Sequence, residues 1–471
     1  MVLNTRDQVL PPPNTSSQQM RHSTIDRRGF MQVGALALGG ITLADVLALR
    51  ADNNQSRKDT SVIMLYQHGG ASQFETWDLK PDAPTEMRSQ FSSISTNVPG
   101  MDICEHFPLQ AKIADKFSLI RSMHHDVDIH SDGGIIALTG KRPTKLDPTS
   151  QSKSEHPDFG HIASHVLGFS NTGMPPYVTL PQRPYMTRPT YLGLHHSSFE
   201  VTDPSKPNYQ TPQLKLTAGR NSRSLLDRNT LLSRLDTLRR NIDIRGELAG
   251  VDEFRKLAYQ MLASPTAAAA FDIEQEPLDV RKRYGLNTWG QSCLLARRLA
   301  EAHVPVINIY CNTPLSGPEH TNWDDHAGNA GRSGHFATFM RTRLPYLDQC
   351  LSALITDIYQ RNLDRKIMVC VVGEFGRTPK IRKGAPDNSV GRDHWPQAYT
   401  ALVSGGGMRM GQVIGATNSK GEYPTQRPTT PQDLLATIYQ HLGINDHATI
   451  ADFFGRPVHI LPHGKPIGEL L

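Results

Sequence analysis

The sequence predicts an α/β fold, a three-layer α/β/α sandwich around a mostly parallel central sheet. Short runs rich in β-branched residues recur at 61–66, 304–310 and 367–372, and segments with apolar residues at helical spacing lie between them. Polar loops that contain Asp, Glu and His follow several of these strands. A repeating order of strand, polar loop and helix is typical of a layered parallel sheet, whose ligands bind at the carboxyl ends of the strands.

The composition is typical of a large globular protein and argues against several other classes of protein. The 471 residues are 38% hydrophobic and carry a formal net charge of +5. This mild charge is dispersed, so no nucleic-acid-binding stripe is present. The five cysteines show no C-x-x-C spacing, which argues against a zinc ribbon. Those at 293, 350 and 370 lie in apolar runs and are expected to be buried free thiols.

The N-terminal region predicts export. Residues 1–25 are polar and are expected to be disordered. Arg27-Arg28-Gly29-Phe30 then precedes a Gly/Ala-rich apolar run, 32–49, as in a twin-arginine signal. A chance arginine pair before a short amphipathic helix is the alternative. The run is too short and glycine-rich for a stable membrane span. We therefore predict a signal within 1–50, a domain over 51–471 and a periplasmic or secreted protein.

The elements expected in the first half begin with a buried strand that ends at a Gly-Gly turn. Charged residues precede this strand, and its apolar run is too short for a helix. A helical segment with regularly spaced leucines is expected to form an insertion over the sheet. In chain order, the pattern predicts a strand at 61–66, a helix at 102–116, a strand at 117–121, helices at 134–139 and 157–168, a strand at 177–180, and the helical insertion at about 215–270.

The second half repeats the same alternation. Thr430 is expected to cap the last helix, which has Pro431 in its first turn. In chain order, we expect a helical turn at 278–285, a helix at 287–302, a strand at 304–310, a helix at 343–361, a strand at 367–372, a strand at 398–403, a hairpin through 413–414 and a helix at 431–442.

Four segments near the ends of the predicted strands hold candidate metal ligands. Carboxylates mixed with imidazoles suit Zn²⁺, Mn²⁺, Mg²⁺ or Ca²⁺ rather than a thiolate site. The number of ions stays open. A loop at 124–132 holds three His and three Asp and is either a further source of ligands or a solvated loop. The predicted ligands are His68, Asp324, Asp325, His326, Glu374, Asp393 and His394.

Structural interpretations of the same residues stay open. Glu374 and Arg377 are compatible with a buried ion pair. Asp393 is compatible with a loop anchor that orients His394 without a metal. One of the two acids at 324 and 325 is compatible with a helix cap, and His68 with packing under the glycine turn.

Three further residues are predicted to take part in catalysis. Arg377 and Arg392 flank the acids, and forked guanidinium hydrogen bonds suit a tetrahedral anion. Ser72 follows the first glycine turn and is either a nucleophile or the N-cap of a following helix.

Several motifs resemble a known family. GGASQFETWDLKPDAP at 69–84, HHDVDIHSDGG at 124–134, NWDDHAGN at 322–329, GEFGRTP at 373–379 and GRDHWP at 391–396 are similar to those of exported bacterial proteins catalogued as domain of unknown function 1501. The resemblance spans about 61–443. This family is placed with sulfatases and phosphopentomutases in the alkaline phosphatase-like superfamily. The resemblance therefore implies an α/β/α fold with a divalent metal site, often double, at the carboxyl edge of the sheet.

The match to the superfamily's site is incomplete. Its first Asp ligand is replaced here by Gln67-His68, although Ser72 stands at the place of the nucleophile. The Asp/His segment in mid-chain is similar to 324–326. The later Asp-His pair is replaced by Glu374-Phe375, whereas His394 resembles the final His ligand. The resemblance thus implies a single-metal hydrolase or a fold that has lost catalysis.

Together, these observations predict an exported metal-dependent hydrolase of phosphate or sulfate esters, acting on a small-molecule or polysaccharide ester. The alternative is a non-catalytic binding or scaffold protein that keeps the fold. Bound metal would favour the hydrolase over the non-catalytic protein, because the hydrolase requires it. A carbohydrate-binding module is disfavoured because the sequence has no aromatic ladder or β-repeat.

Overall fold

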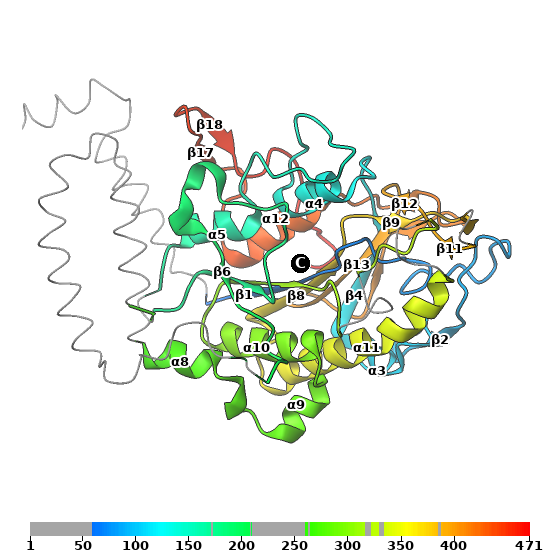
Figure 1. Cartoon of the computed structure of the whole chain (residues 1–471), viewed down its shortest axis with the longest axis horizontal. Helices are drawn as coiled ribbons and strands as arrows, with labels where there is room; N and C mark the ends of the chain where they lie inside the picture. The colour runs from blue at the N-terminus through cyan, green and yellow to red at the C-terminus, as the bar shows by residue number, and fades with distance from the viewer. Residues whose placement is uncertain are drawn as a thin grey trace, which may run out of the picture. The chain divides into compact units, whose positions relative to one another are not determined.

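The predicted α/β sheet is present in the computed structural model, which describes residues 59–170, 173–207, 209, 260–261, 264–315, 322–328, 334–384 and 388–471. Eight strands form this sheet (Figure 1). In spatial order they are β14 (Val413–Ile414), β4 (Phe117–Met123), β13 (Tyr399–Gly405), β8 (Ile367–Val372), β1 (Ser61–Tyr66), β7 (Val306–Tyr310), β5 (Tyr177–Leu180) and β6 (Phe199–Glu200).

The sheet is parallel except for one strand. Strand β1 pairs in parallel with β7 and β8, β5 pairs in parallel with β7 and β6, and β14 pairs in parallel with β4. Only β13 runs antiparallel, between β8 and β4. The carboxyl ends of β1, β7 and β8 therefore meet at one edge of the sheet, where the predicted site residues begin.

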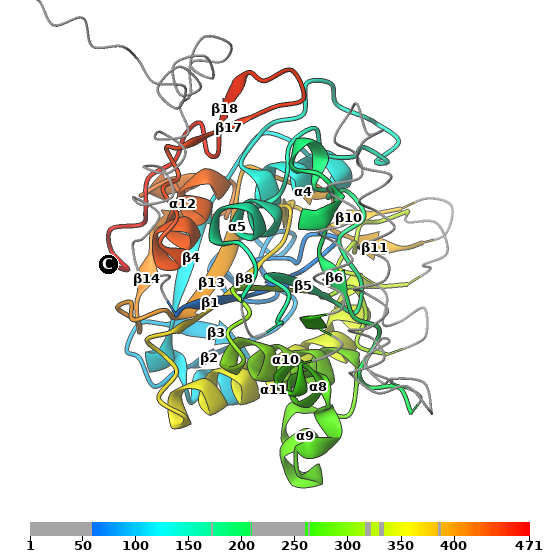
Figure 2. The same ribbon diagram turned by 90° about the vertical axis from the view of Figure 1, so that its left-hand side faces the viewer.

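Helices cover both faces of the sheet and complete the three layers (Figure 2). Alternate residues of β1 belong to two separate hydrophobic cores. Ile63 and Leu65 join the core with α10 and α11, while Val62 and Met64 join the core with α4 and α12. One layer holds α3 (Pro108–Ala111), α8 (Pro265–Phe271), α9 (Leu278–Tyr284), α10 (Thr288–Glu301) and α11 (Phe336–Gln360), and the other holds α4 (His130–Thr139), α5 (Phe159–Leu167) and α12 (Pro431–Leu442).

Most predicted elements are confirmed. The cap of α12 is a complete capping box, in which the Thr430 side chain and the Asp433 side chain each accept the other's backbone N–H. Helix α11 begins at Phe336, earlier than predicted, because His335 Nδ1 accepts the N–H of Ala337 and caps it.

Two element predictions are wrong. The segment 102–116 is not one helix: Asp102–Cys104 forms β3, which pairs with β2 (Ser93–Ser95), and only short helical turns follow. Val413–Ile414 does not form a hairpin with the strand before it, because it pairs in parallel with β4 at the sheet edge. In both places the side chains pack against neighbours that local periodicity does not reveal.

The five cysteines are all free and buried, which confirms the expectation for the three at 293, 350 and 370. The predicted export signal and most of the predicted helical insertion lie outside the described residues. Among the described residues, no helix is both long enough and apolar enough to cross a lipid bilayer.

Candidate metal centre

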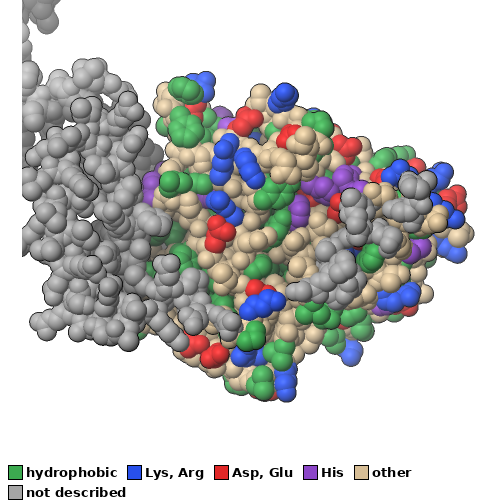
Figure 3. Space-filling view, in the orientation of Figure 1, with side chains coloured by type: hydrophobic (Ala, Val, Ile, Leu, Met, Phe, Trp, Pro, Cys, Tyr) green, Lys and Arg blue, Asp and Glu red, His purple; other side chains and the backbone are tan. Residues whose placement is uncertain are grey.

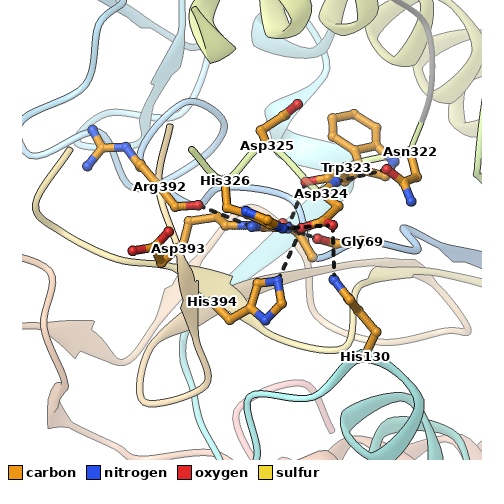
Figure 4. A network of polar contacts seen from close by, with 12 residues as sticks. Gly69, His130, Asn322, Trp323, Asp324, Asp325, His326, Arg392, Asp393 and His394 are labelled. Atoms are coloured by element: carbon orange, nitrogen blue, oxygen red, sulfur yellow. Dashed lines mark hydrogen bonds and ion pairs between the residues drawn. The ribbon is translucent and has the colours of Figure 1, made fainter. Parts of the chain in front are cut away.

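Three imidazoles converge on the carboxylate of Asp324 (Figure 4). The Nε2 atoms of His130 and His326 lie 3.3 and 3.4 Å from Asp324 Oδ2. His394 Nε2 lies 3.1 Å from Asp324 Oδ1. One ligand atom each from His130, Asp324 and His394 can be chosen so that all lie within 4.8 Å of one another. We call His130, Asp324, His326 and His394 the Asp324 cluster. These residues come from the start of α4, the loop after β7 and the short strand β12 (His394–Trp395).

Each imidazole of the Asp324 cluster is anchored through its other nitrogen. These anchors are acceptors, so we assign a proton to Nδ1, and with a metal bound the Nε2 atom that faces Asp324 would present its lone pair. Metal-ligating histidines are oriented in this way by outer carboxylates and carbonyls. The anchoring contacts are His130 Nδ1 to Glu374 Oε1 at 2.7 Å, His326 Nδ1 to the Ala327 carbonyl at 3.1 Å and His394 Nδ1 to the Asp128 carbonyl at 2.7 Å.

Glu374 supports the cluster from behind. Its Oε1 accepts hydrogen bonds from His130 Nδ1 and from the Gly69 backbone N–H, both at 2.7 Å, and lies 3.5 Å from His68 Nδ1. The side chain is fully buried. Burial opposes ionisation, but the charge of His68 and the hydrogen bond from His130 outweigh it and lower the pKa of Glu374 to about 2. Glu374 is therefore a charged anchor for His130.

Asp324 is ionised, and its negative charge is stabilised by Arg377 and by three histidines. Burial opposes this charge, but the nearby Arg377 guanidinium and hydrogen bonds with His130, His326 and His394 hold the pKa of Asp324 well below its usual range. Arg377 Nη2 donates to Asp324 Oδ1 at 2.8 Å. For His130, burial disfavours the cation, yet Asp324 and Glu374 raise its pKa to about 9. The imidazole therefore carries a proton at neutral pH when no metal replaces it.

A rigid packing arrangement fixes Asp324. The neighbouring Trp323 is fully buried, stacks on Trp289 with ring centroids 5.4 Å apart, and has the Arg343 guanidinium 5.2 Å from its ring centroid. Its indole N–H donates to the Cys311 carbonyl at 2.9 Å. Gly69 packs against the same segment with φ +106°, and a Cβ there would lie 2.5 Å from the Asp324 nitrogen. Only glycine allows this close approach.

Two predicted ligands point away from the cluster (Figure 4). The Asp325 carboxylate pairs with the buried Arg343 guanidinium. Asp393 Oδ2 lies 2.8 Å from Arg382 Nε, and its side chain is 37% exposed. We therefore leave both outside the proposed ligand set.

His68 lies beside the cluster rather than within it. Its ring centroid is 5.7 Å from that of His130 and 5.2 Å from that of Tyr310. Burial lowers its pKa, although the charge of Glu374 partly opposes this effect.

The two predicted anion-binding arginines are fully buried and already occupied. Arg377 donates to the Gly70 carbonyl at 2.8 Å and to the Trp323 carbonyl at 3.1 Å in addition to Asp324. It pairs with Asp324, so the ion pair considered between Arg377 and Glu374 is not the one that forms. Arg392 forms a forked pair with the buried Glu75, at 3.1 Å from Nε to Oε2 and 2.9 Å from Nη2 to Oε1.

Ser72 belongs to that second network. Its Oγ donates a short hydrogen bond to Glu75 Oε2, and the residue is 3% exposed. No helix begins at Ser72; residues 73–77 form turns instead, so Ser72 is not a helix cap. Ser72, Glu75 and Arg392 are called the Glu75 network below.

His130 was not among the individually predicted ligands. The sequence signal was the dense His/Asp loop at 124–132, which did not show which member faces the site. His130 is the first residue of α4, and that position aims it at Asp324. His125 has another role, because its Nε2 lies 2.5 Å from the Glu374 carbonyl and its Nδ1 accepts the Val127 N–H at 3.1 Å.

The donor set fits a metal ion. His130 Nε2 is buried and has no hydrogen bond of acceptable geometry, although it faces a carboxylate. His130, Asp324 and His394 place three donor atoms within 4.8 Å of one another, and His326, 3.4 Å from Asp324 Oδ2, would add the fourth ligand of a tetrahedral zinc ion. The charges of Asp324 and Glu374 are balanced by Arg377 together with either a proton on His130 or a bound cation.

Several solved structures show similarity to the chain. The PsFucS1 sulfatase from Pseudoalteromonas sp. shares 11% identity, with 87% of this chain and 73% of that chain covered and a TM-score of 0.38. Lipoteichoic acid synthase LtaP from Listeria monocytogenes shares 10% identity, with 89% and 82% covered and a TM-score of 0.35. Phosphonate monoester hydrolase SpPMH from Silicibacter pomeroyi shares 11% identity, with 87% and 76% covered and a TM-score of 0.34.

No curated protein sequence matched the chain. A family profile did match, over residues 59–471, which include every residue of the Asp324 cluster and of the Glu75 network. This profile is described as "Protein of unknown function (DUF1501)". The chain belongs to the DUF1501 family.

Proposed function

We propose that the protein is a metal-dependent hydrolase of phosphate or sulfate esters and that His130, Asp324, His326 and His394 hold one divalent metal ion. One observation carries the proposal: three imidazole Nε2 atoms face a single carboxylate while their Nδ1 atoms are anchored. Such anchoring costs conformational entropy and is typical of metal-ligating histidines.

The donor set narrows the choice of metal. Imidazole suits Zn²⁺ and related transition metals, whereas Mg²⁺ and Ca²⁺ prefer oxygen ligands. Three nitrogens against one carboxylate therefore favour Zn²⁺, with Mn²⁺ second, over Mg²⁺ and Ca²⁺. The bound ion would supply Lewis acidity toward a phosphoryl or sulfuryl oxygen.

The chain's own residues have separate tasks. Asp324 supplies the negative charge and shares it with Arg377, while Glu374 and two backbone carbonyls fix the imidazoles. The side chains of His326 and His394 are 27% and 24% exposed, so an ester group can reach them from solvent. Histidine side chains gather at the surface between α4 and the β9–β12 pair, where β9 is Gly376–Arg377 (Figure 3).

We propose a small-molecule ester or an ester group on a polysaccharide as the substrate. A partly exposed site is compatible with either. The twin-arginine motif at 27–28 supports a periplasmic or secreted location for this activity.

A non-catalytic binding protein is the second candidate. It is favoured by the saturation of Arg377 and Arg392, because neither guanidinium is free to clamp a tetrahedral anion.

The test compares two neighbouring residues. We expect purified protein to hold about one metal ion per chain by inductively coupled plasma mass spectrometry. His394→Ala should lose it, whereas Asp393→Asn, the matched control outside the cluster, should keep it. Equal metal content in both variants would contradict the ligand assignment.

Turnover then separates the two candidate functions. p-Nitrophenyl phosphate, sulfate and phenylphosphonate are suitable probes, and we expect chelator-sensitive hydrolysis of at least one of them. Stoichiometric metal without turnover of any ester would favour the binding protein.

A further inference from the structure

We infer that hydrolysis occurs by a single displacement in which water, and not a protein hydroxyl, attacks phosphorus or sulfur. The inference rests on the proposed function. It concerns Ser72, the hydroxyl that the sequence places where a covalent nucleophile is expected.

Ser72 is held in a structural network. Its Oγ donates to Glu75 Oε2, and its backbone carbonyl accepts the Thr76 hydroxyl at 2.7 Å. Glu75 is fully buried and bonded to Arg392, which also donates to the Thr378 and Arg88 carbonyls at 3.1 and 2.9 Å. The guanidinium of Arg392 lies 4.4 Å from the Phe74 ring centroid. To reach a substrate, Ser72 would have to leave a buried acceptor that is paired with Arg392.

The acceptor also prevents activation of the serine. A nucleophilic hydroxyl needs a base that takes its proton. Glu75 cannot readily serve as this base, because its carboxylate is neutralised by a forked, desolvated arginine pair. The histidines of the Asp324 cluster turn their Nε2 atoms toward Asp324 and their Nδ1 atoms toward acceptors, and none is recorded in contact with Ser72 Oγ.

Three other hydroxyls on the described segments that bear the site are occupied as well. Thr76 donates to the Ser72 carbonyl, Ser131 donates to Asp132 Oδ2 at 2.7 Å, and Thr378 donates to the Lys380 carbonyl at 3.0 Å. Ser131 is fully buried. With Ser72 and these three hydroxyls held in place, water at the exposed edges of His326 and His394 is the attacking group in this inference.

The step balances without any co-reactant. The water oxygen forms a bond to phosphorus or sulfur, and the bond from that atom to the ester oxygen breaks. One water proton ends on the leaving alcohol, and the other stays on the released phosphate or sulfate. Because there is one displacement, the configuration at phosphorus inverts, whereas a covalent intermediate would give two displacements and retention.

The decisive experiment is the stereochemical course for the wild-type, metal-loaded protein. An aryl phosphorothioate made chiral with two oxygen isotopes is hydrolysed in water that carries the third isotope, and we expect the configuration of the thiophosphate product to be inverted. Retention would overturn the inference while leaving the hydrolase function intact. Absence of turnover for every ester would remove the proposed function and this inference with it.

A variant gives an independent second measurement. Ser72→Ala should keep its metal and a rate within about tenfold of wild type, because it loses only a structural hydrogen bond. Loss of several orders of magnitude in kcat with normal metal content, or isolation of a phosphorylated Ser72 peptide after acid quench, would overturn the inference. If Ser72→Ala does not fold, the stereochemical result alone decides.

Discussion

The Asp324 cluster and the Glu75 network each hold a buried acid that is paired with a fully buried arginine, but the two regions differ in purpose. Three consecutive residues show the contrast: Arg392 turns to Glu75, Asp393 turns outward to Arg382, and His394 turns to Asp324. In the Glu75 network every charge is neutralised by a partner of opposite sign. In the Asp324 cluster one of the two buried carboxylate charges is balanced only by a proton on His130 or by a bound cation. A charge that is balanced by an exchangeable ion, rather than the density of polar residues, distinguishes this candidate binding site from the structural network.

The largest expected effect is on metal affinity, and it distinguishes two adjacent acids. Asp324→Asn should lower metal affinity by more than about 100-fold, because it removes both a ligand and the charge that faces three imidazoles. Asp325→Asn should leave metal affinity within a few-fold of wild type, since its carboxylate pairs with Arg343. Competition titration with a chelating dye measures both. Equal losses of metal affinity in the two variants would contradict the assignment of Asp324, and not Asp325, as the ligand.

A substitution in the Glu75 network should lower the free energy of unfolding instead of the metal affinity. Glu75→Gln leaves the fully buried Arg392 without its charged partner, and breaking such a pair costs about 3 kcal/mol or more. Metal content should not change. Arg382→Ala is the control, because its exposed pair with Asp393 contributes less than about 1 kcal/mol. Urea unfolding measures both, and a loss of metal in folded Glu75→Gln would show that the two regions are one unit.

Glu374 lies behind the cluster, and we expect an intermediate effect there. Glu374→Gln keeps the size of the side chain but removes the charge that orients His130. Loss of an outer partner of this kind lowers metal affinity by about 10- to 100-fold. Isothermal titration of the metal-free protein with Zn²⁺ measures it. Complete loss of binding would instead assign Glu374 as a ligand, as the sequence had predicted.

The smallest expected effect for a single step is the pH dependence of metal binding, at about tenfold per pH unit. The pKa of His130 is raised to about 9 in the metal-free protein, so the ion must displace a proton below that pH. For His130 alone, affinity should rise by about tenfold per pH unit up to about pH 9. Titration in buffers of different ionisation enthalpy counts the proton released.

The same shift affects the stability of the metal-free protein. Because the folded pKa lies above that of an unfolded histidine, about 6.5, His130 stabilises the metal-free fold fully below pH 6.5. This contribution is lost as pH rises through about 9. Urea midpoints of metal-free protein between pH 6.5 and 9 should therefore fall more than those of Glu374→Gln, whose His130 lacks the anchoring charge. A larger fall in the variant would contradict this account.

Sequence reasoning predicted the fold well because its strands are short, apolar and followed by glycine or acidic residues. It failed where strand pairing is non-local, as for Val413–Ile414, which pairs with Leu119 and Ile120. Within the site, strand ends and motifs named Asp324, His326 and His394. The direction of each side chain was not accessible, since Asp325 and Asp393 are turned away by pairing with Arg343 and Arg382. His130 was hidden in a loop of similar residues, because only the packing of α4 on the sheet selects it.

We expect the Asp324 cluster to form late in the folding reaction. The contact between Asp128 and His394 joins positions 266 residues apart, and His130 reaches Glu374 across 244. Contacts of such high sequence separation form slowly. A nascent or truncated chain that lacks the residues after Gly391 has no His394 and hence an incomplete ligand set. Metal binding would therefore indicate that the whole domain has folded. Metal content would then measure completed folding as well as function.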